Sequence, residues 1–186
     1  MMIDSSEARA ALDDIKDMVA RVRQSHIYDI ASLIMVATGV MVLAGNIATF
    51  MMPRYGGNIW IGINVLNVVI AAVISVVTRS RTGIHSFDGR VLAAFLMFYG
   101  FGLLCTGVLG HFGGRELGVF WPIYFMLFYS LAGLWFGRAF LAIGLSITAL
   151  TLIGYFFIGG LTFLLWMAVV NGGGLILSGF WMRRGE

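Results

Sequence analysis

The side chains with the most reactive chemistry are few and widely separated. The histidines are His26, His85 and His111, and the single cysteine is Cys105. A lone cysteine excludes an intramolecular disulfide and a thiolate metal site within one chain. A bis-histidine haem needs two axial ligands at similar depth on facing helices, and no second histidine is expected beside His111. We therefore expect no catalytic residue, no metal site and no bound cofactor.

Acid–base chemistry inside the apolar segments is equally poorly supported. No Asp, Glu, Lys or Arg lies in the middle of any long apolar stretch. Proton relays and ion-coupled pumps usually need such a buried ionisable group. The sequence also contains no HExxH, GxSxG or P-loop motif. These absences predict that the protein is not an enzyme and not a proton-driven antiporter.

Uncharged polar side chains within apolar segments are the best remaining candidates for a site. The set is Asn46, Asn64, Asn67, Tyr99, Tyr129 and Asn171. One interpretation is an interior polar pocket for a small neutral ligand. The other is a set of interhelical hydrogen bonds that hold a bundle together, each worth roughly 0.6 kcal/mol. We favour the second interpretation.

Composition shows which elements must position these residues. The chain of 186 residues is 60% hydrophobic and only 11% charged, whereas soluble domains carry roughly 25% charged residues. Such a surface must face lipid. The predicted fold is an all-α polytopic transmembrane bundle of six helices, arranged as three stacked hairpins. The predicted spans are 28–51, 58–77, 91–111, 117–136, one that begins near residue 139, and 161–182.

Small residues four positions apart predict where these helices approach closely. The pairs are Ala44 with Ala48, Gly45 with Thr49, Gly110 with Gly114, and Gly133 with Gly137. Pairs of this kind allow backbones of neighbouring helices to touch. We expect packing within one chain to explain them more simply than dimerisation.

The distribution of basic residues predicts the orientation. With the N-terminus inside, ten of the twelve Lys and Arg residues fall on the cytoplasmic side, and only Arg54 and Arg115 fall outside. Cytoplasmic loops of membrane proteins carry this excess. Both termini are therefore expected in the cytoplasm, with the protein in a bacterial inner membrane. The net charge of +3 is explained by this topology, so no nucleic-acid partner is expected.

The first 27 residues predict an amphipathic cytoplasmic helix joined to the first span. Its apolar stripe is formed by Leu12, Ile15, Val19 and Val22, while charged residues cover the rest of its surface. The stripe has two interpretations: a helix lying on lipid headgroups, or a docking surface for a protein partner. The predicted organisation is this helix in residues 1–27, a transmembrane domain in residues 28–182 and a cytoplasmic tail in residues 183–186.

Part of the sequence resembles small bacterial six-span membrane proteins. The resemblance is carried by FWPIYFMLFYSLAGLWFGR, IGLSITALTLIGYFFIGG and FLLWMAVVNGGGLILSGFWMRR, within residues 120–184. In size and hairpin plan the chain is also similar to HdeD-type six-helix proteins, although it lacks their clear repeat units. The resemblance implies a role in signalling or regulation and supplies no catalytic motif.

These observations favour a non-enzymatic membrane protein that binds or regulates a partner through its N-terminal helix. Its expected partners are membrane lipids, a cytoplasmic protein and, as a further option, other copies of the chain. Two alternatives remain open. One is a transporter or channel for a small neutral solute, and the other is a scaffold subunit of a larger membrane complex.

Overall fold

The computed structural model describes residues 5–82 and 89–184, and within these ranges the regular structure is entirely helical. The elements are α1 (Ser5–Met51), the short 3-10 helix η1 (Pro53–Tyr55), α2 (Gly56–Thr82), α3 (Gly89–Leu109), α4 (Gly114–Phe136), α5 (Arg138–Phe157), α6 (Thr162–Met167), the π-helical segment η2 (Ala168–Gly173) and α7 (Gly174–Arg184). The all-α fold class is therefore confirmed for the described residues.

Five helical runs in the described residues are long and apolar enough to cross a membrane. They are Tyr28–Met51, Pro53–Ile74, Gly114–Trp135, Arg138–Phe157 and Thr162–Arg183. The described part of α3 adds a shorter apolar stretch, Leu96–Leu109. This pattern of several long apolar helices is that of a membrane protein.

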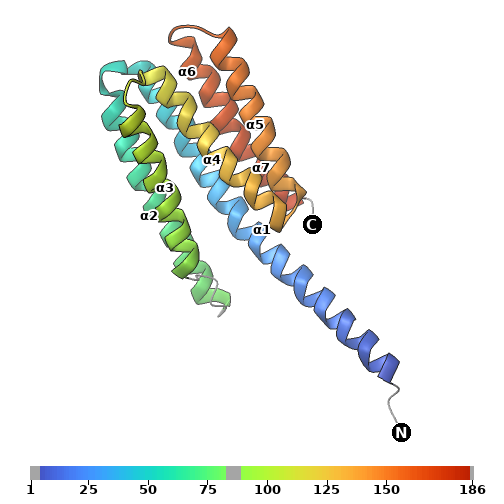
Figure 1. Cartoon of the computed structure of the whole chain (residues 1–186). Helices are drawn as coiled ribbons and strands as arrows, with labels where there is room; N and C mark the ends of the chain where they lie inside the picture. The colour runs from blue at the N-terminus through green and yellow to red at the C-terminus, as the bar shows by residue number, and fades with distance from the viewer. Residues whose placement is uncertain (1–4, 83–88, 185–186) are drawn as a thin grey trace.

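α1 is a single helix of 47 residues. The sequence predicts an amphipathic helix up to residue 27 joined to a span from residue 28, and in the structure the two form one helix with no break. Residues 5–38 contain neither Pro nor Gly, so nothing interrupts the backbone hydrogen bonds before the span. The first half of α1 extends away from the bundle, and only the second half packs among other helices (Figure 1).

The core lies between the second half of α1, α4, α5 and the run from α6 to α7. One cluster of buried side chains joins these elements: Met35, Met126, Phe140, Ile143, Ile147, Val170, Leu175 and Met182. A second, smaller cluster of Val119, Phe163 and Met167 joins α4 to α6. Closely packed apolar side chains thus fill the interior of the bundle along most of its length.

Contacts at the two ends of the bundle show that its helices alternate in direction. The ring of Tyr28 packs 5.5 Å from that of Phe140 at the start of α5, and Met182 near the end of α7 belongs to the same core cluster. At the opposite end, Arg115 near the start of α4 donates to the carbonyl of Tyr155 near the end of α5. Short connections between the helices produce this antiparallel arrangement.

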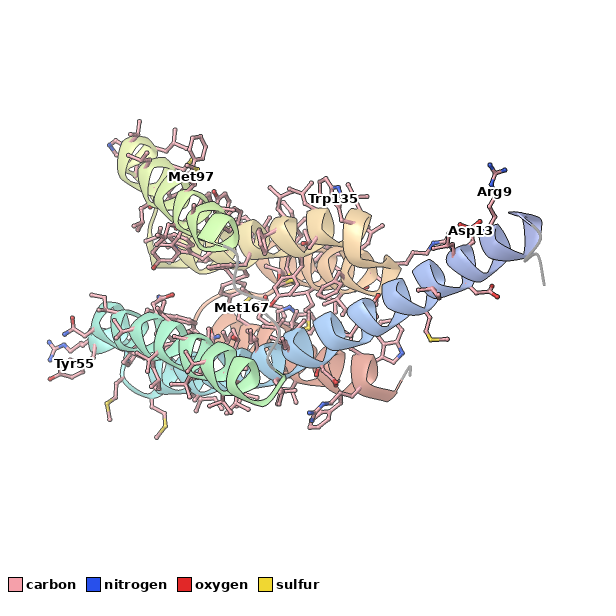
Figure 2. All side chains as sticks on the ribbon, turned by 90° about the horizontal axis from the view of Figure 1, so that it is seen from below. Arg9, Asp13, Tyr55, Met97, Trp135 and Met167 are labelled. Carbon is pink, nitrogen blue, oxygen red and sulfur yellow. The ribbon has the colours of Figure 1, made fainter. Side chains whose placement is uncertain are left out.

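α2 and α3 lie outside this core, each on a different helix. α2 packs on α1, where Gly45 faces the side chain of Ile63. α3 packs on α4, where the Tyr124 hydroxyl donates to the carbonyl of Phe98 at 2.8 Å and the two rings stack 4.1 Å apart. Figure 2 shows Met97 of α3 and Tyr55 of η1, just before α2, on separate arms of the molecule.

The last predicted span is not a uniform α-helix. The sequence predicts one α-helix over 161–182. The structure has α6, the π-helical η2 and α7 there, which follow one another without a loop. The backbone N–H of Gly174 reaches the carbonyl of Val169, five residues earlier, which is the hydrogen bond of a π-helix. The three consecutive glycines from residue 172 weaken the α-helical preference at this point.

Candidate functional site

A buried polar contact joins α5 to the π-helical segment. The Nδ2 of Asn171 donates to the hydroxyl of Thr151 at 3.3 Å and lies 3.4 Å from the sulfur of Met167. Both polar side chains are buried. A buried amide that loses its partner costs about 1–3 kcal/mol, so this pair fixes α5 against η2. Thr151 is not among the residues predicted from the sequence, since threonine is common in apolar helices and only its neighbour across the bundle distinguishes it.

The π-helical segment also brings its backbone against α1. A Cβ atom on Gly172 would lie 2.7 Å from the Cα of Leu43, and one on Gly39 would lie 2.7 Å from the carbonyl oxygen of Gly172. About two turns further along, a Cβ on Gly179 would lie 2.8 Å from the carbonyl oxygen of Ser32. These distances leave no room for a side chain. We call the line of contact between α1 and η2–α7 the glycine seam.

Arg115 closes the opposite end of the bundle. Its Nη2 donates to the carbonyl oxygens of Tyr155 at 2.5 Å and Ile158 at 2.6 Å. These carbonyls lie at the end of α5, where backbone acceptors have no partner within the helix. The guanidinium also lies 5.2 Å from the ring centre of Tyr155 and 5.0 Å from that of Phe163, which are cation–π distances. Arg115 therefore ties α4 to the connection between α5 and α6, a structural role.

The predicted asparagines of α1 and α2 bond within their own helices. Asn46 is buried and donates to the carbonyl of Val42 at 2.9 Å. Asn64 donates to the carbonyl of Trp60 at 2.8 Å, and Asn67 lies half-buried one turn further along α2. Bonds of this kind satisfy the amide locally. They do not by themselves create a ligand site.

The two predicted tyrosines each pack against an aromatic ring on the next helix along the chain. The ring of Tyr99 on α3 lies 5.3 Å from that of Trp121 on α4. The ring of Tyr129 on α4 stacks 6.3 Å from that of Phe140 on α5. Such pairs contribute about 0.5–1.5 kcal/mol beyond burial of their area. Both residues therefore stabilise helix packing.

The six predicted polar residues are distributed over five elements. Asn46 is on α1, Asn64 and Asn67 on α2, Tyr99 on α3, Tyr129 on α4 and Asn171 on η2. Five of them have a described partner outside the set. A shared pocket for a neutral ligand stays a prediction, as does solute transport through it.

An open groove of about 200 Å³ lies on the surface of α4. It is lined by Phe120, Ile123, Tyr124 and Leu127, which are spaced three and four residues apart along one face of the helix. The lining is apolar apart from the tyrosine hydroxyl, which donates to α3.

Reactive side chains are not gathered anywhere in the described residues. Within residues 5–82 and 89–184, no three or more His, Cys, Asp or Glu side chains are placed to hold a metal ion. Cys105 is half-buried in α3, and His111 is exposed just after that helix. The side chains of His26 and His85 lie outside the described residues.

The predicted partner stripe lies on the part of α1 that leaves the bundle. Leu12 is 55% exposed and Ile15 is 58% exposed. The side chains of Val19 and Val22 lie outside those that the structure describes. Figure 2 shows Arg9 and Asp13 on the same projecting segment, away from the other helices. No other element of the described chain covers Leu12 or Ile15.

Comparisons with other proteins provide no further guide to the site. No protein-family model, no curated protein and no solved structure matches this chain. Its function must therefore be inferred from its own residues.

Proposed function

We propose that this chain is a six-span integral membrane protein that binds a cytoplasmic protein partner through the projecting segment of α1. We define the projecting segment as residues 5–27. The observation that carries the proposal is the unbroken α1, which holds the exposed side chains of Leu12 and Ile15 outside the bundle while its other half lies in the core.

The six-span count is supported by the length of α3. This helix has 21 residues, which at 1.5 Å per residue makes it about 31 Å long. A typical hydrocarbon core is about 30 Å thick. We therefore count α3 as a sixth crossing beside the five apolar runs, a count that would put both ends of the described chain on one side.

The charge distribution supports a cytoplasmic location for those ends. The end of the bundle where Tyr28, Phe140 and Met182 meet also carries Arg138 and Arg183 in the sequence. The opposite end carries Arg54 and Arg115. Because basic residues gather on the cytoplasmic side of membrane proteins, the projecting segment belongs in the cytoplasm.

The continuity of α1 favours docking over attachment to lipid headgroups. A helix that spans the membrane and then lies along its surface needs a sharp bend between the two parts. Sharp bends almost always occur at Pro, at Gly or where the backbone ladder is interrupted, and α1 has none of these before Gly39. At 1.5 Å per residue, the 23 residues of the projecting segment reach about 34 Å beyond the span.

The same continuity supplies a route for regulation. The span of α1 packs against η2 and α7 along the glycine seam, where backbones touch. A partner that tilts or rotates the projecting segment would also move the span of α1. This span has no free space beside η2 at Gly39, so its movement would displace η2. The partner's binding energy would be transmitted to the core by rigid-body motion of α1.

Photo-crosslinking in native membranes tests the proposal. A benzophenone amino acid replaces Leu12, Ile15 or, as the matched control on another face, Asp14 in the full-length chain. We expect the first two positions to give the same discrete adduct with one other protein and position 14 to give none. Adducts that are equal at all three positions, or absent at positions 12 and 15, would contradict partner binding through the stripe.

A further inference from the structure

Building on the proposed function, we infer that the partner presents an amphipathic helix whose apolar stripe is flanked by carboxylates. The inference rests on the arrangement of charge along the projecting segment. Leu12 and Ile15 are exposed in a regular helix, so the positions beside them can be assigned from 3.6 residues per turn.

One edge of the stripe carries basic residues at every heptad. Arg9, Lys16 and Arg23 are seven residues apart, so successive members shift by only about 20° around the helix. All three positions fall beside Leu12, and the Arg9 side chain is exposed. In a pair of packed helices, residues at such flanking positions face the flanking residues of the partner and select them by charge.

The other edge of the stripe is uncharged. Ala11 and Met18 occupy it, and Met18 is exposed. The aspartates at positions 13, 14 and 17 lie further round the helix than the basic edge. The segment therefore offers an apolar surface with positive charge along one side only.

The balance of charge points to a helix rather than to a diffuse anionic surface. Residues 5–27 contain four basic residues (Arg9, Lys16, Arg21, Arg23) and four acidic residues (Glu7, Asp13, Asp14, Asp17), so their formal sum is zero. A bilayer of anionic lipids or a nucleic acid is attracted by net positive charge. A partner helix contacts one face of the segment only, so it can pair with the regularly spaced basic residues along one edge of the stripe.

A second copy of this chain is a poorer match to that edge. Copies in one membrane have the same orientation, so their projecting segments pair as parallel helices. Lys16 of one copy would then face Ala11 of the other, and Arg23 would face Met18. Two of the three basic positions would thus lack a carboxylate, whereas a different helix with Glu or Asp at the matching positions satisfies all three.

Matched peptides test the charge preference. The probes are two fluorescent 22-residue amphipathic helices with identical leucine stripes, one with Glu and one with Lys at the flanking positions. The full-length chain is held in nanodiscs of phosphatidylcholine alone, and binding is measured by fluorescence anisotropy. Because exposed helix ion pairs each change affinity about twofold, we expect the Glu peptide to bind about tenfold more tightly at low salt and the difference to shrink at high salt.

Charge reversal provides the decisive variant. The triple change Arg9→Glu, Lys16→Glu and Arg23→Glu should invert the preference toward the Lys peptide. The single change Lys16→Glu should reduce the preference for the Glu peptide about twofold to fourfold. This single variant replaces the triple variant in the test if circular dichroism shows that the triple variant loses helicity. A control with Asp14→Asn and Asp17→Asn should keep the order of the two peptides.

The outcomes separate this inference from the proposed function. The two peptides could bind equally, and the double variant Leu12→Asp with Ile15→Asp could abolish the binding of both. That result would overturn the charge preference but would leave partner binding through the stripe intact. Absence of peptide binding, or stripe-dependent pairing of two copies of the chain, would also overturn it. If the crosslinks at positions 12 and 15 are missing as well, the proposed function falls with it.

Discussion

Helices pack closely along the glycine seam and loosely at the two outer helices, α2 and α3. Along the seam, α1 and η2–α7 approach until backbone atoms touch, and a buried Asn–Thr pair locks η2 to α5. α2 and α3 each touch one core helix, and most of their apolar side chains remain exposed. In α2 none of the residues in its most apolar window is buried.

This difference shows which helices carry stability. Lipid is as apolar as a leucine side chain, so apolar area alone does not drive helices together inside a membrane. Close backbone approach and hydrogen-bonded polar pairs hold helices together there. The seam should therefore tolerate few substitutions, whereas α2 and α3 should tolerate apolar changes on their outer faces.

Methionine truncation should separate the two regions most strongly. Met35 is fully buried in the core and Met97 on α3 is 75% exposed. We expect Met35→Ala to lower the free energy of unfolding by about 2–5 kcal/mol, because it leaves a cavity. Met97→Ala should change it by no more than about 0.5 kcal/mol. Thermal unfolding in detergent, followed by circular dichroism, measures both, and equal losses would contradict the division.

Neighbouring glycines sharpen the comparison within η2. Gly172→Ala places a Cβ against the backbone of Leu43 and should destabilise the fold by about 1–3 kcal/mol. Gly173 has no atom within 4 Å of its Cβ position, so Gly173→Ala should be neutral or stabilising by up to about 1 kcal/mol. The same unfolding assay applies. A Gly172→Ala variant as stable as the parent would show that the seam can separate.

Two threonines of α5 provide the smallest expected difference. Thr151→Val removes the partner of the buried Asn171, and we expect a loss of about 1 kcal/mol. Thr148 donates only to the carbonyl of Gly144 in its own helix, at 2.7 Å. Thr148→Val should therefore cost less than half as much in parallel unfolding measurements. The reverse order would argue against an interhelical lock.

Helix positions and two packing contacts follow closely from the sequence. The predicted spans overlap the observed helices because hydropathy and Gly or Pro punctuation act locally. Gly45 packs on α2, and Gly133 packs against the backbone of Leu141, so these two glycines serve contacts within the chain. A Cβ on Gly114 would meet no atom within 4 Å, so its pairing with Gly110 marks no such contact. The N-terminal segment and the first span form one helix, because hydropathy changes at residue 28 but backbone propensity does not.

The partners of individual side chains could not be predicted in this way. The polarity of Asn171 indicates a hydrogen bond, but its pairing with Thr151 depends on the rotation of α5 relative to η2. The charge of Arg115 predicts a position outside the membrane, but its bonds to Tyr155 and Ile158 depend on where α5 ends in space.

Two features can be deduced from the sequence alone: the described chain is helical, and its helices are apolar enough for lipid. Each of these depends on residues close together in the chain. The tertiary structure is needed to see which helices form the core, that a π-helical turn meets α1 at Gly39, and that α1 continues beyond the bundle without a bend. These features depend on distances between residues far apart in sequence, which composition and periodicity do not encode.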